Sequence, residues 1–353
     1  MSTRQCLHLT LLLTLSGCQR EPAGNQDAPA ATVPSRPTAP GDSPPSQPST
    51  YVALIYDLQG PGKDLTEGLV EQLTSRLDPH GIEGIRVRLA NRNQLEVLVP
   101  GNPAGGHLAH IKYRISQPGH LEFRITADRQ RHQQLFTLLD ASPLSSARQL
   151  FQEEANGTRK LMGKWVQIAR GPANSTGLKP FKYIPRDDVI RDAVSGQRLS
   201  LDNFQPATAN PGMELAGYLQ KLNVSNIEIL VFTGDGYHLG NKLVNSATSL
   251  ATDGHSAIDI HFTPVGAVEL TRLTANNESD PGQRRARLAI ILDNRILSAP
   301  RIMEELRTEH ALIAGAFDAA EAENLAAILR SGALPRQLEL VFQEQRPLVL
   351  SAP

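Results

Sequence analysis

The strongest constraint on the fold is the succession of strand-like and helix-like patterns where the apolar part of the chain begins. Residues 51–58, YVALIYDL, are rich in β-branched and aromatic side chains and predict a strand. Leucines four residues apart within 65–77 predict a helix with one apolar face. The segments IRVRLA, at 85–90, and QLEVLVPG, at 94–101, alternate apolar and polar residues, so we expect a hairpin that turns at residues 91–93.

A second helix and a further strand complete this pattern. Leu108, Ile111 and Ile115 fall on one face of a predicted helix over 105–117, and HLEFRIT at 120–126 predicts a strand. The resulting order β-α-β-β-α-β is that of a ferredoxin-like unit, in which an antiparallel sheet carries both helices on one face. We therefore predict an α+β fold whose ferredoxin-like base occupies residues 51–127.

The rest of the chain predicts a second, larger α/β lobe. Residues 147–155 have a helical pattern, whereas HSAIDIHF, at 255–262, alternates as a half-buried strand does. LAIIL, at 288–292, is apolar throughout, which is typical of a strand covered on both faces. The predicted divisions are an inserted head lobe at 128–335, a closing strand at 336–346 that returns to the base, and a C-terminal tail at 347–353.

The first 50 residues predict a lipid anchor followed by a tether. Leu7 to Leu15 form an apolar run that is too short to cross a bilayer but suits the h-region of a signal peptide. The run ends Leu15-Ser16-Gly17-Cys18, which resembles the lipobox of bacterial lipoproteins. In that family the signal is cut before the cysteine, so the resemblance implies that Cys18 is lipidated. Residues 19–50 are rich in Pro, Ala and Ser and predict a disordered linker.

The N-terminal sequence also predicts the cellular location of the protein. Residues 1–18 become a lipoprotein signal peptide, although an ordinary signal peptide that happens to contain a cysteine remains the alternative. Gln19 follows the cysteine in place of the aspartate that often retains lipoproteins in the inner membrane. We therefore expect a periplasm-facing protein of the cell envelope that is lipid-anchored to a membrane, with the outer membrane favoured.

Composition argues against several classes of function. The formal net charge is −1 and aromatic residues make up 5%, so the chain offers neither a strong electric field nor a stacking platform for nucleic acid. Cys6 and Cys18 are the only cysteines, so we expect no disulfide and no thiolate metal site in the folded part. No set of acid, base and nucleophile is evident, and we predict a protein that is not an enzyme and has no cofactor.

One histidine-containing strand invites a metal-site interpretation. His255, Asp259 and His261 share one face of the predicted strand at 255–262, and imidazole and carboxylate groups are ligands that Zn²⁺ accepts. The outward face of a half-buried strand is, however, usually only solvated. We therefore expect no metal site here.

Three other polar clusters have simple structural interpretations. His107 and His110 lie three residues apart on a predicted helix, but no third ligand is evident near them. The segment TGDGYHLG at 233–240 lacks the Lys-Ser/Thr of a phosphate-binding loop and predicts a turn. The basic cluster RRAR at 284–287 predicts a solvated turn.

A string of motifs in the last third of the chain resembles a known family. LAIILDNRILSAP, followed by AGAFDAAEAENLAAILRSGALPRQLELVFQEQ, resembles the SecD subunit of the bacterial Sec translocase, and in particular its large first periplasmic domain. EVLVPG and GHLEFRI in the first half resemble SecD strands as well. The residues that carry the family motif, which we expect to be structural, are Asp293, Asn294, Ser298, Ala299, Pro300, Gly315, Phe317, Glu321, Gly332, Leu334 and Pro335.

The chain departs from that family in two ways. Asn294 stands where the family has glycine, and Asn also tolerates positive φ, so the hairpin is expected to survive. Family members also carry transmembrane helices thought to use the proton gradient, and no later segment of this chain is apolar enough to cross a membrane. The family's motor function is therefore not expected.

The resemblance implies a role in protein export. We expect a non-catalytic, SecD-like envelope lipoprotein that acts as an accessory in translocation and binds emerging or unfolded polypeptide, Sec translocase membrane subunits, or both. The alternative is a structural or ligand-binding envelope lipoprotein that has kept the SecD fold without an export role. Neither reading calls for nucleic acid, and both reach the membrane through a lipid anchor only.

Overall fold

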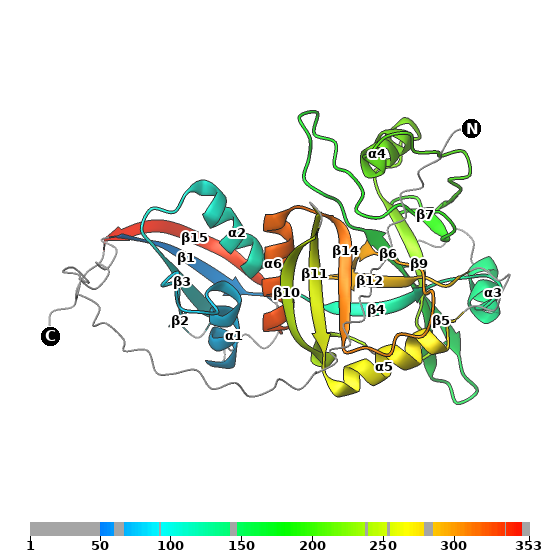
Figure 1. Cartoon of the computed structure of the whole chain (residues 1–353), viewed down its shortest axis with the longest axis horizontal. Coiled ribbons are helices and arrows are strands. Elements are labelled where there is room, and N and C mark those ends of the chain that lie inside the picture. Colours follow the sequence, from blue (N-terminus) through cyan, green and yellow to red (C-terminus); the bar gives the residue numbers. More distant parts are fainter. Residues whose placement is uncertain are drawn as a thin grey trace, which may run out of the picture.

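The protein is described by a computed structural model in which two lobes lie side by side (Figure 1). The structure describes residues 50–59, 67–91, 93–141, 147–236, 239–252, 255–278, 285–335 and 337–347. The expected signal peptide, the lipidation of Cys18, the linker up to residue 49 and the tail from residue 348 lie outside the described residues. Among the described residues, no helix is both long and apolar enough to cross a membrane.

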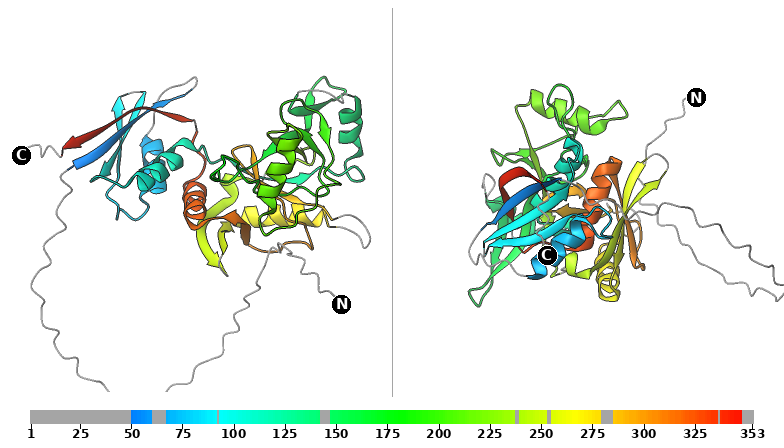
Figure 2. Two further views of the ribbon diagram at one scale, coloured as in Figure 1. Left: turned by 90° about the horizontal axis from the view of Figure 1, so that it is seen from above. Right: turned by 90° about the vertical axis from the view of Figure 1, so that its left-hand side faces the viewer.

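The smaller lobe, called the base, is built on a four-stranded antiparallel sheet. Its strand order is β15-β1-β3-β2. Alternate residues of β1, among them Leu54 and Tyr56, are buried against the helices, together with Leu73 of α1 and Ile115 of α2. Both helices therefore cover one face of the sheet (Figures 1 and 2). The elements of the base are β1 (Thr50–Leu58), α1 (Glu67–Leu77), β2 (Arg86–Asn91), β3 (Gln94–Pro100), α2 (Gly105–Ser116) and β15 (Leu338–Pro347).

The expected fourth strand of the base lies in the other lobe. β4 (Leu121–Thr126) pairs with β12 (Leu288–Leu292) and with β9 (Ile227–Phe232), so the prediction that residues 120–126 complete the base was wrong. β15 pairs with β1 instead, with Thr50 opposite Pro347. The alternating pattern of residues 120–126 specifies a strand but not the sheet that it joins. β4 suits a central position beside the uniformly apolar β12 rather than a place in the base sheet, because four of its six residues are buried.

The larger lobe, called the head, contains an eight-stranded sheet. Its order is β5-β6-β13-β12-β4-β9-β7-β8, and an additional pairing joins β6 to β9. The strands β6, β13, β12, β4 and β9 therefore form a closed ring of pairings, which removes free edges from the centre of this sheet. Its remaining strands are β5 (Gln149–Glu153), β6 (Arg159–Ile168), β7 (Ile190–Asp192), β8 (Arg198–Leu199) and β13 (Arg295–Ser298). Residues 147–155 were expected to be helical, but β5 forms there because it pairs with β6.

A second sheet of the head, with the order β10-β11-β14, packs against α6. Ile258, Ile260 and Phe262 of β11 face the core, as the alternation predicted. The Thr263 and Asp318 side chains accept hydrogen bonds from the backbone N–H groups of Gly266 and Glu321 and so begin α5 and α6. The elements are α3 (Gln133–Ala141), α4 (Pro211–Lys221), η1 (Asn241–Leu243), β10 (Val244–Thr252), β11 (His255–Phe262), α5 (Pro264–Ala275), β14 (His310–Phe317) and α6 (Ala319–Ser331).

Candidate functional site

The chain crosses between the lobes through two adjacent segments. Residues 117–120 lead from α2 into β4, and residues 332–337 lead from α6 into β15. The backbone N–H of Leu334 donates to the Pro118 carbonyl at 2.7 Å, which ties the two segments together. We call this region the junction. Figure 1 shows α6 at the border between the base and the head.

One arginine holds both crossing segments. Arg76 lies in the last turn of α1 and is fully buried. Its guanidinium donates to the Gln117 carbonyl at 2.6 Å, the Pro118 carbonyl at 3.3 Å and the Ser331 hydroxyl at 2.7 Å. It also donates to the carbonyls of Arg114, at 3.1 Å, and Gly332. Burial lowers the pKa of Arg76 to about 10, although Asp293 acts in the opposite direction, so the guanidinium stays charged at neutral pH.

The hairpin turn of the SecD-like motif also contacts the junction. Asp293 and Asn294 have φ values of 48° and 60°, which is the backbone of a type I′ turn. The Asp293 carboxylate accepts hydrogen bonds from the backbone N–H groups of Gly119 and His120, each at 2.8 Å. The aspartate of the motif therefore contacts the first crossing segment directly.

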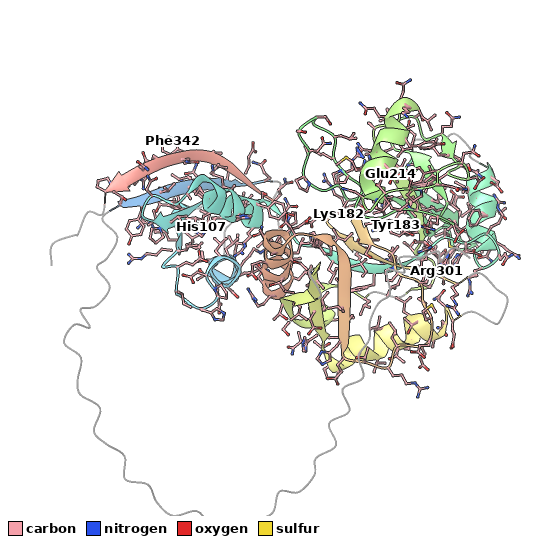
Figure 3. The ribbon with its side chains drawn as sticks, turned by 45° about the horizontal axis from the view of Figure 1, so that its top comes forward. His107, Lys182, Tyr183, Glu214, Arg301 and Phe342 are labelled. Atoms are coloured by element: carbon pink, nitrogen blue, oxygen red, sulfur yellow. The ribbon has the colours of Figure 1, made fainter. Side chains whose placement is uncertain are left out.

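Other residues of the motif lie in three different settings. Ser298 and Ala299 are buried in the head, and the Pro300 carbonyl accepts from the Leu288 N–H. Glu321 forms an ion pair with Lys182, whose ammonium lies 5.3 Å from the centre of the Phe317 ring. Figure 3 marks Lys182 and the neighbouring Tyr183 in the head. Gly315 lies within β14, and Pro335 is exposed beyond the end of α6.

Two motif residues join Asp293 at the junction. Gly332 ends α6 with a φ of 78°, and Leu334 is fully buried in the core of the base. Sequence reasoning missed Arg76, although a signal was present: it lies three residues after Leu73, within the leucine stripe, where an unpaired charge would be costly.

A polar contact joins the helices of the two lobes. Asn324 of α6 is buried, its side-chain oxygen accepts from Arg114 Nε at 2.7 Å, and its amide nitrogen lies 2.7 Å from His110 Nδ1. His107, three residues away, instead lies 3.3 Å from Glu83. The two α2 histidines thus have separate partners and share no ligand set among the described residues.

The outer strand of the base carries an exposed apolar patch. Within the described residues, β15 pairs with β1 on one side and leaves its other edge open. Leu340, Val341 and Phe342 are 37%, 47% and 49% exposed. Phe342 stands opposite Ile55, so it lies on the face of the sheet away from the helices. Figure 3 shows Phe342 on β15.

Charged side chains flank Phe342 on the same face. Glu96 of β3 is only 3% exposed and pairs with Arg88 of β2 and with Arg346 of β15, the latter at 2.6 Å. Arg346 also pairs with Glu344. The open face therefore has an apolar part at Phe342 and an ionic part at Glu96.

The histidine strand of the head is assembled differently from the sequence expectation. Asp259 and His261 of β11 lie next to each other, and the third partner is His310 of β14. The side chain of His255 lies outside the described residues. In the basic cluster, Arg287 lies 3.9 Å from Asp187 and donates to the Ala299 carbonyl, so it is not merely solvated.

Comparison with known proteins gives consistent matches. Residues 223–336 match the family model described as SecDF, P1 head subdomain. The chain is 36% identical over 115 residues to the protein translocase subunit SecD of Acidaminococcus fermentans, which is 33% of this chain and 26% of that one. It is 27% identical over 242 residues to the SecD of Magnetococcus marinus, which is 67% of this chain and 42% of that one. The chain thus spans less than half the length of these relatives.

Solved structures of SecDF are also similar. The crystal structure of SecDF in the super-membrane-facing form has a TM-score of 0.49 and 18% identity, and the match covers 88% of this chain and 32% of that one. A structure described as a membrane component SecDF that enhances protein export has a TM-score of 0.46 and 18% identity, with 82% and 98% covered.

The fold and the junction define a two-lobed, mixed α/β domain. The family match falls on the head and includes the Asp293 turn and α6. The SecD relatives support the resemblance drawn from the motifs. The folded part is similar to SecD-family periplasmic domains, and its residues 223–336 match the SecDF P1 head subdomain.

Proposed function

We propose that this chain is a non-catalytic accessory of protein export, held at the cell envelope by a lipid on Cys18, which binds emerging polypeptide along the free edge of β15. The observation that carries the proposal is the exposed run Leu340, Val341 and Phe342 on an edge of the base that pairs with no other described strand. The similarity to translocase subunits supports a translocase membrane subunit as a second partner.

We propose that the base is a ferredoxin-like unit. Its elements follow the order β-α-β-β-α, and β15 supplies the last strand in an antiparallel sheet ordered β15-β1-β3-β2. In this division the base consists of residues 50–116 and 338–347, and the head is inserted between α2 and β15. The motif residues at the junction, led by Asp293, have a structural role: they fix the head on the base.

The edge of β15 has features that favour peptide binding. Proteins usually protect an exposed edge by making it short or by placing charges or proline along it. β15 is ten residues long and presents three consecutive apolar residues before its charged end. Val341 lies where the register with β1 shifts, so the strand is irregular there. Main-chain hydrogen bonds along the edge would bind many sequences, and the apolar patch would favour unfolded ones.

The location follows from the N-terminal sequence. Leu15-Ser16-Gly17-Cys18 supports a lipid anchor, and Gln19 favours the outer membrane. A tether over residues 19–50, at about 3 Å per residue if extended, lets the folded part reach tens of ångströms from the bilayer.

The test is binding of a labelled, unfolded secretory polypeptide to the purified protein, measured by fluorescence anisotropy. The double variant V341K/F342K places charges on the free edge, and we expect it to weaken binding at least about tenfold, since each buried apolar side chain is worth about 1.5–3 kcal/mol. V268K is the matched control, because Val268 is a 57% exposed valine on α5 of the head.

Two results would contradict the proposal. One is the absence of binding at high micromolar concentration together with no membrane partner recovered by crosslinking. The other is an equal loss in V341K/F342K and V268K. If deletion of the gene also left export unchanged, the alternative of an envelope lipoprotein without an export role would be favoured.

A further inference from the structure

A carboxylate and two imidazoles converge on the outer face of the β10-β11-β14 sheet. His261 of β11 is directly opposite His310 of β14, and their ring centres are 3.8 Å apart. Asp259, two residues before His261, projects from the same face of β11. Its carboxylate lies 2.9 Å from His261 Nε2 and 3.9 Å from His310 Nδ1. One potential ligand atom from each residue lies within 4.8 Å of the others.

We propose that Asp259, His261 and His310 bind a divalent transition-metal ion of the Zn²⁺ type. Zn²⁺ takes imidazole nitrogen and carboxylate oxygen at about 2.0–2.2 Å, and a tetrahedral ion holds such donors about 3.3 Å apart. The separations of 2.9 Å between Asp259 Oδ2 and His261 Nε2 and of 3.9 Å between Asp259 Oδ1 and His310 Nδ1 lie on either side of that value.

The backbone that carries these residues is well fixed. Ile258 and Ile260, which alternate with Asp259 and His261, are fully buried, and Ile313 of β14 is 1% exposed. Their burial determines which face of each strand points outward, because a shift of one residue would expose the whole apolar set. The ligands therefore stand on paired strands, which hold a metal site more accurately than loops do.

The ligand set leaves room for exchange at the metal. The side chains of Asp259, His261 and His310 are 23%, 36% and 55% exposed, so water can reach the ion. Two imidazoles and one carboxylate occupy three positions of a tetrahedral ion and leave the fourth to water or to an outside ligand. Such a set favours Zn²⁺, Cu²⁺ or Ni²⁺ over Mg²⁺ and Ca²⁺, which prefer oxygen.

A bound ion would join β11 to β14, and this effect is independent of the peptide edge on the base. β11 is the middle strand of its sheet, and β14 leads directly into α6, which reaches the junction. An ion that binds the native state alone stabilises the head by an amount that grows with the logarithm of the ion concentration once this exceeds the Kd.

The test is calorimetric titration of the untagged, EDTA-treated protein with Zn²⁺ at about pH 7.5. We expect one ion per chain and a rise in Tm on Zn²⁺ addition. H261A and H310A should each weaken binding at least about tenfold. H107A is the matched control, because His107 lies on α2 of the base with Glu83 as its partner.

A second metal ion and the two histidine variants decide whether the proposal holds. Mg²⁺ should give neither heat nor a Tm shift at the same concentrations. The proposal is overturned if Zn²⁺ does not bind at high micromolar concentration, or if H261A and H310A bind as the wild type does. Circular dichroism of both variants establishes that a lost signal reflects a lost ligand, since both histidines are partly exposed and their replacement leaves the core intact.

Discussion

Replacing Arg76 with methionine should destabilise the protein by loosening the junction. Methionine has a similar reach but cannot donate, so the carbonyls of Arg114, Gln117, Pro118 and Gly332 lose the guanidinium that they share. Hydrogen bonds to a charged group contribute about 1.5–3 kcal/mol each, but the desolvation of a buried charge costs several kcal/mol in return. We expect a net loss of about 3–5 kcal/mol in the free energy of unfolding.

The assay combines urea unfolding with hydrogen exchange. The midpoint of unfolding should fall in R76M, and the backbone amides of Gly119, His120 and Leu334 should exchange faster because these residues belong to the two crossing segments. R76K should fall between wild type and R76M, since an ammonium keeps the charge but loses the planar fork. R307M is the control, because the Arg307 side chain is 79% exposed, and it should change stability by less than about 0.5 kcal/mol.

A small effect of R76M on stability would contradict this role of Arg76. If R76M unfolds within about 1 kcal/mol of the wild type, the hydrogen bonds at Arg76 do not hold the lobes together. Unchanged exchange at Leu334 together with a large loss of stability would show that the effect lies within the base rather than at the junction.

Three further variants test individual features. Gly119→Ala should cost about 2 kcal/mol or more by urea unfolding, because Gly119 has a φ of +85° and a Cβ there would lie 2.6 Å from Ile328 Cγ2; an unchanged midpoint would contradict this. Asn294→Gly, at a φ of 60°, should change stability by less than about 1 kcal/mol, while a larger loss would mean that the asparagine side chain matters. Burial lowers the pKa of His132 from 6.5 to about 4, so the folded state favours the neutral imidazole. The stability gained from the neutral imidazole is present above pH 6.5 and is lost as the pH falls to 4. H132Q should therefore remove about 3 kcal/mol of pH dependence in that interval, and equal slopes for both proteins would refute the assignment.

Strands with a clear apolar pattern could be predicted from the sequence. β12 is apolar throughout and lies in the centre of the larger sheet, as expected, and the alternation of β11 gave its buried face correctly. β10 could not be predicted, because Ala247 is the only fully buried residue among those of β10 whose side chains are described, and the strand depends on pairing with β11. The helical pattern of residues 147–155 likewise gave way to pairing with β6.

The candidate sites were harder to predict because they depend on contacts between distant segments. Asp259 and His261 are close in sequence, but the register that brings His310 beside them is not encoded in either segment alone. At the junction, the Asp293 turn could be recognised, whereas its partners at Gly119 and His120 belong to a connection without a pattern. Arg76 had a local signal, and its five acceptors did not.

The pairing of β1 with β15 sets the order in which the two lobes can form. During synthesis or export, β1 emerges first, while the strand that stands beside it emerges only after the whole head. The head can acquire its core beforehand, but the base must wait with one side of β1 open and vulnerable to wrong partners. A premature stop codon just after α6 would therefore leave a folded head attached to an incomplete, aggregation-prone base.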